Sequence, residues 1–362
     1  MFAMQFYVFD SGLPQPSHFL LAFFFALSVL YSSGRFDVKG NKFIFGCGLF
    51  FVCYTIVLNS FFTFLHQDPS FLRASIYYVY GFIAFIILGL ELRQRKSARY
   101  ALSASCVLGL TFLVVAYTIG MGRYDFSPRY NGYFNDPNQM AFWALCCYSL
   151  YCLLVDNNLS RMLLAIPLVF LILVSMSRSG LLGLVFVGLG LSLNFLSLNK
   201  KNLIRTVYFV VIITISIGCL LYLSESGVVD ELISSVFNRF ADSDFEEQAD
   251  IRGYGRIFKY GEYLLFGAGQ GMDFRFESTN EIHSTWVGLL FYYGAIGCSS
   301  FLLFIFLLLR SLSFDKILFS MAPLIYGFST FGMRTPIFWI LFSAMLVAKA
   351  DSDKAKSSLV YL

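Results

Sequence analysis

The sequence predicts an all-α, polytopic membrane protein that forms one integral membrane domain over residues 1–362. Of these residues, 58% are hydrophobic and only 13% are charged, whereas a soluble domain averages roughly 45–50% apolar and about 25% charged residues. Apolar runs of about twenty residues recur along the chain, and a helix of that length can cross a hydrocarbon core. The runs are continuous rather than alternating, which excludes a membrane β-barrel.

Length and hydropathy predict about eleven membrane-spanning helices, separated by basic or turn-forming connectors. In chain order the predicted spans are 17–33, 42–63, 74–90, 100–120, 139–155, 161–176, 180–198, 205–223, 284–309, 317–333 and 335–349. The basic connectors and tail carry Arg35, Lys39 and Lys42; Arg93, Arg95, Lys96 and Arg99; Lys200, Lys201 and Arg205; and Lys349, Lys354 and Lys356. With eleven spans all of these lie on one side, which we assign to the cytoplasm because Lys and Arg accumulate there.

Two places in this topology admit alternatives. Parity leaves the first sixteen residues outside, but Met1–Phe9 is apolar and could instead pack on the membrane. The apolar run 162–198 is interrupted by Ser177-Arg178-Ser179-Gly180. Because basic residues flank this run on both sides, we expect two short crossings with Arg178 at an outer turn. The alternative is one tilted helix with a snorkelling Arg178.

Two outer segments are long enough to carry function. Residues 121–138 read MGRYDFSPRYNGYFNDPN and are rich in turn-forming residues. Residues 224–283 form the only long hydrophilic region, and long loops in compact proteins are often functional. Within that region, residues 251–266 place two arginines and a tyrosine at four-residue steps. This spacing predicts an amphipathic helix along the membrane surface.

The outer side carries ten basic residues, nine of them arginines, although basic residues ordinarily accumulate inside. They are Arg73, Arg123, Arg129, Arg178, Arg239, Arg252, Arg256, Lys259, Arg275 and Arg334. A guanidinium is a planar fork that fits two phosphate oxygens, whereas an ammonium is a point charge. We therefore expect the outer face to bind a phosphorylated substrate. The net charge of +4 is small and gives no indication of nucleic-acid binding.

His283 stands where the long loop re-enters the membrane, in the segment Glu281-Ile282-His283-Ser284. Histidine is the side chain best suited to move a proton near neutral pH, and Glu281 could orient it or share the role of base. Gly294 and Gly297 follow inside the next span, where glycines allow close helix packing. Taken alone, these residues fit equally well an interfacial histidine with a packing glycine pair.

Four sequence elements together resemble the bacterial O-antigen ligase and polymerase superfamily. They are His283-Ser284 followed after nine residues by Gly294-Ala295-Ile296-Gly297; Gly132-Tyr133-Phe134-Asn135-Asp136-Pro137-Asn138 with Ala141; Ser175-Met176-Ser177-Arg178-Ser179-Gly180; and Arg252 followed by Gly267-Ala268-Gly269-Gln270-Gly271. The resemblance covers roughly residues 120–310, and the N-terminal third of the chain contributes only hydropathy to it.

This resemblance implies a glycosyltransferase of the bacterial inner membrane, with a GT-C-like helical fold and its active face in the periplasm. Members use sugars carried on undecaprenyl diphosphate and work without a metal or another cofactor. A Wzy-type polymerase transfers the growing glycan from its lipid carrier onto the next lipid-linked repeat unit. The implied partners are lipid-linked oligosaccharides and membrane lipid, with a polysaccharide chain-length regulator as a further candidate.

The implied chemistry gives each candidate residue an expected role. Arginines can stabilise the charge of a departing diphosphate in a site of low dielectric constant. The candidates are Arg178, Arg252, Arg256 and Arg129. His283, with Glu281 beside it, is expected to accept the proton of the attacking sugar hydroxyl. Asn138 and Arg334 are secondary candidates for the substrate site. Each arginine could alternatively contact only a lipid headgroup.

Two other functions stay open at this point. An O-antigen ligase would transfer the glycan to lipid A core, and neither length nor motifs separate it from a polymerase. A flippase or transporter of a lipid-linked or anionic solute would place ionisable groups near the midplane of broken helices. Here the predicted spans are almost free of charge and the candidate residues gather at one face. This distribution favours chemistry at a surface.

Overall fold

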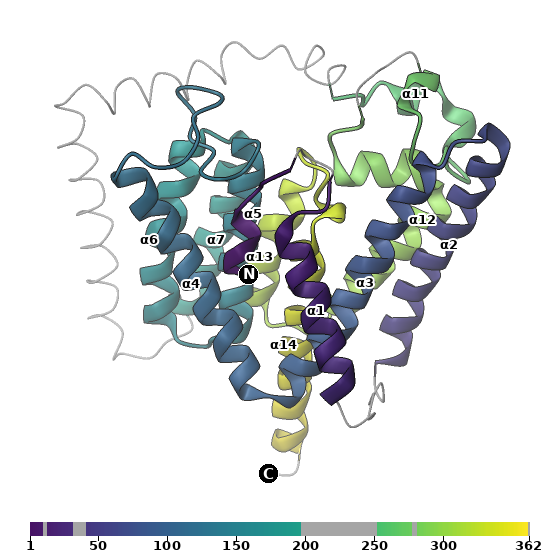
Figure 1. The fold of residues 1–362 in the computed structure, drawn as a ribbon. Helices are drawn as coiled ribbons and strands as arrows, with labels where there is room; N and C mark the ends of the chain where they lie inside the picture. The colour runs from purple at the N-terminus through teal and green to yellow at the C-terminus, as the bar shows by residue number, and fades with distance from the viewer. Residues whose placement is uncertain (10–12, 32–40, 197–251, 277–280, 361–362) are drawn as a thin grey trace.

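Apolar α-helices make up most of the chain that the structure describes (Figure 1). The computed structural model describes residues 1–9, 13–31, 41–196, 252–276 and 281–360. Its helices are α1 (Pro16–Tyr31), α2 (Lys42–His66), α3 (Ser70–Gln94), α4 (Lys96–Thr118), α5 (Pro137–Leu154), α6 (Asn158–Ser175), α7 (Arg178–Leu196), α11 (Arg256–Lys259), α12 (Thr285–Leu309), α13 (Phe314–Tyr326) and α14 (Pro336–Val360), with short 3-10 turns at η1 (Phe2–Gln5), η3 (Gly261–Tyr263), η4 (Asp273–Phe276) and η5 (Gly332–Arg334). No strand occurs in these ranges, so the all-helical prediction is confirmed for them.

Within the described residues, five helices are long and apolar enough to cross a membrane, namely α2, α3, α4, α6 and α12. Helices α1 and α7 are shorter but also apolar. Large apolar side chains such as Phe19, Phe64 and Leu163 are exposed on the outside of the bundle, as expected where lipid replaces water. The protein is therefore a helical membrane protein. The predicted span 205–223 and most of the predicted loop 224–283 lie outside the described residues.

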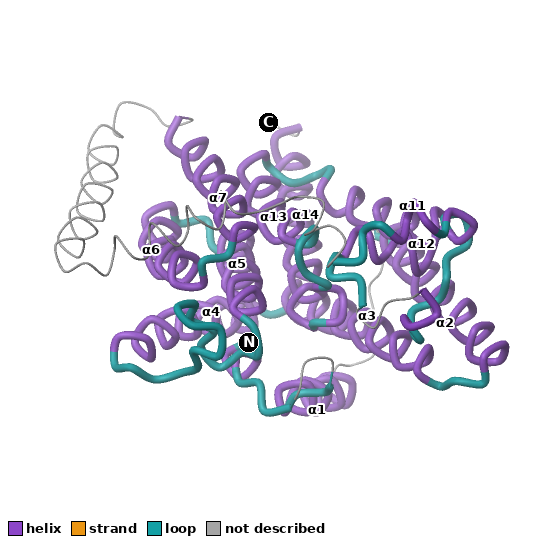
Figure 2. The backbone as a smooth tube through the Cα atoms, turned by 90° about the horizontal axis from the view of Figure 1, so that it is seen from above, coloured by secondary structure: helices purple, strands orange, loops and turns teal. Residues whose placement is uncertain are grey.

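Helix α14 lies at the centre of the bundle and carries Trp339, the largest fully buried side chain among the described residues. Trp339, Phe338 and Phe342 are fully buried and contact aromatic rings of α3, α5 and α12. Figure 2 shows α4 to α7 on one side of α14, and α2, α3 and α12 on the other. Helix α13 packs on α7 and α5. In the described part of the chain, α1 packs mainly on α3 and the N-terminal turn η1.

The run 162–198 folds as two antiparallel helices rather than as one tilted helix. Helix α6 ends at Ser175, α7 begins at Arg178, and Met176 between them adopts a left-handed conformation with φ of 48°. Ile172 and Ser177 both lie close to the backbone of Gly180, so the turn is tight. The predicted division into two helices is confirmed, but the break lies at residues 176–177, and residues 178–180, which were predicted to form the interruption, begin α7.

The continuous amphipathic helix predicted over residues 251–266 is not what the structure shows. Only α11 and the 3-10 turn η3 form there, and Gly253 adopts a positive φ of 73°. Glycines at 253, 255, 261 and 267 punctuate the segment, and glycine gains little from helix formation because it loses more backbone freedom than other residues. The four-residue spacing was outweighed by these interruptions.

Helix α12 is broken at Gly294, where φ is 62° and ψ is −175°. Residues 264–268 supply partners for the backbone groups that the break leaves unpaired. The amide of Ala295 donates to the carbonyl of Leu264 at 2.7 Å, and the amide of Ala268 donates to the carbonyl of Phe291 at 3.0 Å. In Figure 1 the first part of α12 lies at an angle to the second, which runs down beside α2 and α3. Gly294 therefore has two roles. It ends the first piece of α12, and it allows the close packing predicted for it.

One ion pair joins two of the predicted inner segments. Arg99 at the start of α4 lies 2.7 Å from a carboxylate oxygen of Asp351 in the last part of α14. The two connectors that the sequence assigns to one side of the membrane are therefore at the same end of the bundle. The residues described next lie at the opposite ends of these two helices.

Candidate functional site

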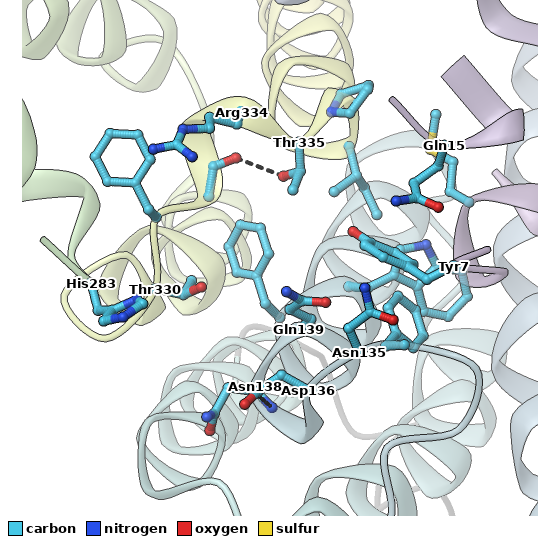
Figure 3. Close-up of a pocket in the computed structure, with 18 of the residues that line it drawn as sticks. Tyr7, Gln15, Asn135, Asp136, Asn138, Gln139, His283, Thr330, Arg334 and Thr335 are labelled. Atoms are coloured by element: carbon cyan, nitrogen blue, oxygen red, sulfur yellow. Dashed lines mark hydrogen bonds between the residues drawn. The ribbon is translucent and has the colours of Figure 1, made fainter. Parts of the chain in front are cut away.

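A cavity of about 530 Å³ lies where the N-terminal segment, the loop before α5, the loop before α12 and the loop before α14 meet. Five of the residues predicted for the site line it, although they come from four different parts of the chain. They are Asn138, Arg252, Glu281, His283 and Arg334. The other three predicted arginines, Arg129, Arg178 and Arg256, are not among its lining residues. Figure 3 shows His283 and Thr330 on one side of the cavity and Tyr7 on the other.

Backbone contacts hold His283 at the cavity, and they leave its imidazole exposed. The side chain of the next residue, Ser284, caps α12 by accepting the amide of Val287 at 3.3 Å. The amide of His283 donates to the carbonyl of Arg252 at 3.2 Å, which fixes the two residues side by side. Partial desolvation and then the charge of Arg252 lower the pKa of His283 below its ordinary value. The imidazole is therefore predominantly neutral at pH 7 and can accept a proton.

Arg252 brings a guanidinium to the cavity. It is half-buried and lines the cavity, yet no residue within the described ranges forms an ion pair or a side-chain hydrogen bond with it. A half-buried cation without a partner is costly unless an anion binds to it. Arg252 is therefore the predicted phosphate-binding residue whose surroundings in this structure best fit that role.

Arg334 and Glu281 form an ion pair on the cavity wall. Glu281 also accepts a hydrogen bond from Nε2 of Gln270 at 3.2 Å. Gln270 is itself held in place, because its Oε1 accepts the hydroxyls of Tyr78 at 2.7 Å and Tyr293 at 2.9 Å. Within the described chain no hydrogen bond joins Glu281 to His283. Glu281 orients Arg334 here, and the predicted partnership with His283 is not formed.

Arg256 points away from the cavity into a buried polar cluster. It is 5% exposed, and its Nη1 lies 2.6 Å from Oδ1 of Asp273. The same oxygen accepts the hydroxyl of Tyr292 at 2.6 Å, and that hydroxyl accepts the amide of Ile282 at 3.1 Å. The cluster therefore fixes the backbone immediately before His283 from behind. The structure gives Arg256 a carboxylate inside the protein in place of a position on the cavity.

Arg129 and Asn138 join the two motif segments that flank the helix pair α5 and α6. Arg129 donates to Oδ1 of Asn138 at 3.0 Å and to the carbonyl of Ser175 at 2.9 Å. The hydroxyl of Tyr326 donates to the carbonyl of Asn138 at 2.9 Å and lies 2.6 Å from the hydroxyl of Ser177. Arg178 follows directly at the start of α7 and is partly buried. These contacts explain why residues 132–138 and 175–180 are adjacent in space.

Several cavity residues were not predicted from the sequence. Tyr7, Asp136, Gln139, Thr330 and Thr335 all line it and are drawn in Figure 3. Asp136 also begins α5, because its side chain accepts the amide of Asn138 at 2.6 Å. Its position inside the Gly132–Asn138 motif was a usable signal, whereas Tyr7 lies in an apolar segment with no motif. Among the residues described, no group of three metal-ligating side chains is placed to hold an ion.

No protein-family model matches this chain, and no curated protein matches it either. The functional argument therefore depends on the cavity and on the chemistry of the side chains that line it.

Proposed function

We propose that the protein is a glycosyltransferase of the bacterial inner membrane that polymerises O-antigen or a related surface polysaccharide. It transfers the growing glycan from undecaprenyl diphosphate onto the next lipid-linked repeat unit at the periplasmic face. One observation carries this proposal: Arg252, which has no ion-pair partner among the described residues, is fixed beside His283 in a cavity large enough for a small-molecule group. An anion site and a proton acceptor are the two elements that the transfer needs.

The proposed reaction uses these residues in one displacement. A hydroxyl of the acceptor sugar attacks the anomeric carbon of the donor, a new glycosidic C–O bond forms, and the C–O bond to the diphosphate breaks. His283 accepts the hydroxyl proton, while the leaving diphosphate keeps the electron pair. Arg252 stabilises the negative charge that develops on the diphosphate. Arg334 lies on the same cavity wall and can add a second contact when its pairing with Glu281 is exchanged for phosphate oxygens.

The test is complementation of a deletion strain, read by electrophoresis of the surface polysaccharide. We expect Arg252→Ala and His283→Ala to abolish long glycan chains while the protein still accumulates in the membrane. Arg99→Ala is the matched control, since it removes an arginine from the opposite end of the bundle. A normal ladder of long chains in both site variants would contradict the proposal.

The deletion phenotype also separates the alternative functions. Single repeat units on the lipid A core indicate loss of a polymerase, whereas a bare core with accumulated lipid-linked polymer indicates loss of a ligase. A flippase would move labelled lipid-linked sugar across proteoliposomes without any glycan growth. The cavity favours transfer over transport, because its ionisable side chains lie in loops and at helix ends rather than in the middle of α2, α3 or α4.

A further inference from the structure

The two sides of the cavity differ in chemistry. Arg252, Glu281, His283 and Arg334 all lie on the side formed by the loops before α12 and α14. The side formed by the N-terminal segment and the start of α5 is mostly uncharged and combines aromatic rings with amides. It includes Tyr7, Phe126, Phe134, Asn135, Gln139 and Trp143. Figure 3 shows Tyr7, Asn135 and Gln139 lying apart from His283 and Arg334.

The N-terminal segment is fixed across this side of the cavity. The amide of Tyr7 donates to the carbonyl of Tyr133 at 3.0 Å, and Arg123 donates to the carbonyl of Tyr7 at 3.2 Å. Nδ2 of Asn135 donates to the carbonyl of Phe9 at 2.9 Å. Every one of these contacts uses the backbone of the segment. The segment is therefore a built wall of the cavity, at the same end of the bundle as residues 121–138.

Tyr7 is one side chain on this wall with hydrogen-bonding capacity to spare. Its ring packs against Phe134 with 5.3 Å between centroids, and its hydroxyl has no hydrogen-bond partner in the described part of the chain. Burial raises the pKa of Tyr7 to about 12, so the hydroxyl stays protonated and can both donate and accept. An aromatic residue with a polar end suits a ligand that has apolar faces and a polar edge.

We propose that this uncharged side of the cavity is a carbohydrate subsite, with Tyr7 as a residue that contacts the sugar. A pyranose has faces of C–H groups that pack on aromatic rings, and an edge of hydroxyls that bond to amides and phenols. The wall sets the hydroxyl of Tyr7 and the amide of Gln139 among aromatic rings, which suits a sugar better than a hydrocarbon tail, and it lacks the arginines and lysines that a diphosphate needs. The proposal rests on the proposed function and assigns the glycan and the diphosphate to opposite sides of one cavity.

The experiment measures two probes separately on the purified full-length protein in detergent. One probe is the repeat-unit oligosaccharide released by mild acid from the host's lipid-linked intermediates, detected by saturation-transfer difference NMR. The other is inorganic pyrophosphate, detected by calorimetry. Tyr7→Phe removes only the hydroxyl, and Gln139→Ala removes an amide. Tyr133→Phe is the matched control. Tyr133 lies on the loop before α5, next to the N-terminal segment, and is not among the residues that line the cavity.

We expect Tyr7→Phe and Gln139→Ala each to weaken oligosaccharide binding about fivefold, as for loss of one neutral hydrogen bond, and to leave pyrophosphate binding unchanged. Arg252→Gln should do the reverse. Absence of oligosaccharide binding, or binding that neither Tyr7→Phe nor Gln139→Ala weakens, overturns the subsite. If the protein still binds pyrophosphate in that case, the proposed function stands. Displacement of the oligosaccharide by a polyprenol without phosphate would assign this side to the lipid tail and also overturn it. Oligosaccharide binding without pyrophosphate binding would support the subsite and count against the proposed reaction.

Discussion

The guanidinium of Arg256 lies 2.6 Å from the carboxylate of Asp273, and both side chains are largely buried. This pair decides which of the two neighbouring arginines faces the cavity. Arg252 and Arg256 are one helical turn apart in sequence and were predicted to act together. Asp273 neutralises Arg256 inside the protein, and Arg252 keeps its charge at the cavity.

Removing Asp273 should therefore destabilise the protein more than removing an exposed acid. Asp273→Ala leaves a buried guanidinium without its carboxylate, a loss of about 3–5 kcal/mol of unfolding free energy in comparable pairs. The measurement is thermal unfolding in detergent. Asp351→Ala is the control, since Asp351 is half-exposed and its pair with Arg99 should contribute less than about 1 kcal/mol. Equal shifts in the two variants would show that the buried pair contributes no more than the exposed one.

The acid limb of the pH–activity profile should respond to two charges in opposite directions. Activity requires neutral His283, whose pKa lies below its ordinary value, so activity should persist to a pH below about 6.5. Arg252 lowers and Asp136 raises that pKa. We therefore expect Arg252→Gln to move the acid limb to higher pH and Asp136→Asn to move it to lower pH. The measurement is residual glycan extension by membranes as a function of pH. Shifts of the same sign would exclude His283 as the titrating group.

Gly294→Ala should prevent normal folding of α12. A methyl group there would lie 2.4 Å from the carbonyl oxygen of Leu265 and 2.6 Å from the amide nitrogen of Gly267, in a backbone conformation that is essentially restricted to glycine and costs another residue about 1–3 kcal/mol before any clash. We expect little protein in the membrane and early thermal unfolding. Gly46→Ala in α2 is the control, because nothing lies within 4 Å of its added methyl group. That change should stabilise by about 0.5–1 kcal/mol, and similar behaviour of both variants would contradict the strained geometry at Gly294.

Tyr326→Phe should loosen the contact between the two motif segments around α6. The change removes the hydroxyl that bonds to the carbonyl of Asn138 and to Ser177, and unsatisfied buried polar groups cost about 1–3 kcal/mol each. Thermal unfolding and protease accessibility of residues 121–136 would report the effect. Tyr100→Phe is the control, because Tyr100 is 73% exposed on α4. An unchanged melting temperature in Tyr326→Phe would mean that these hydrogen bonds do not hold the segments together.

The helices could be predicted from the sequence because hydropathy and run length are local properties. The interruption at Ser177–Gly180 was also readable, since flanking basic residues required an even number of crossings. The convergence of Arg252, Glu281 and His283 on one cavity followed from the predicted topology, which puts all three at the same end of the bundle. Each of these inferences needs only the order of polar and apolar residues along the chain.

The remaining features depend on partners distant in sequence. Nothing near Arg256 indicates that Asp273 and Tyr292 will bury it, and nothing near Arg334 indicates its pairing with Glu281. Spacing placed both arginines on the correct side of the protein without revealing which carboxylate each would meet. Tyr7 was missed for the same reason, because its position on the cavity wall is set by backbone contacts with residues 123–135.

The interrupted helix α12 also constrains the order in which the protein is assembled. Its exposed amides and carbonyls at Gly294 would be costly in hydrocarbon if they met no partner. Their partners, residues 264–268, precede the helix in the chain and so leave the ribosome first. The segment is therefore already made when α12 reaches the bilayer, and its backbone can pair the groups at Gly294 although its side chains Leu265 and Phe266 stay exposed.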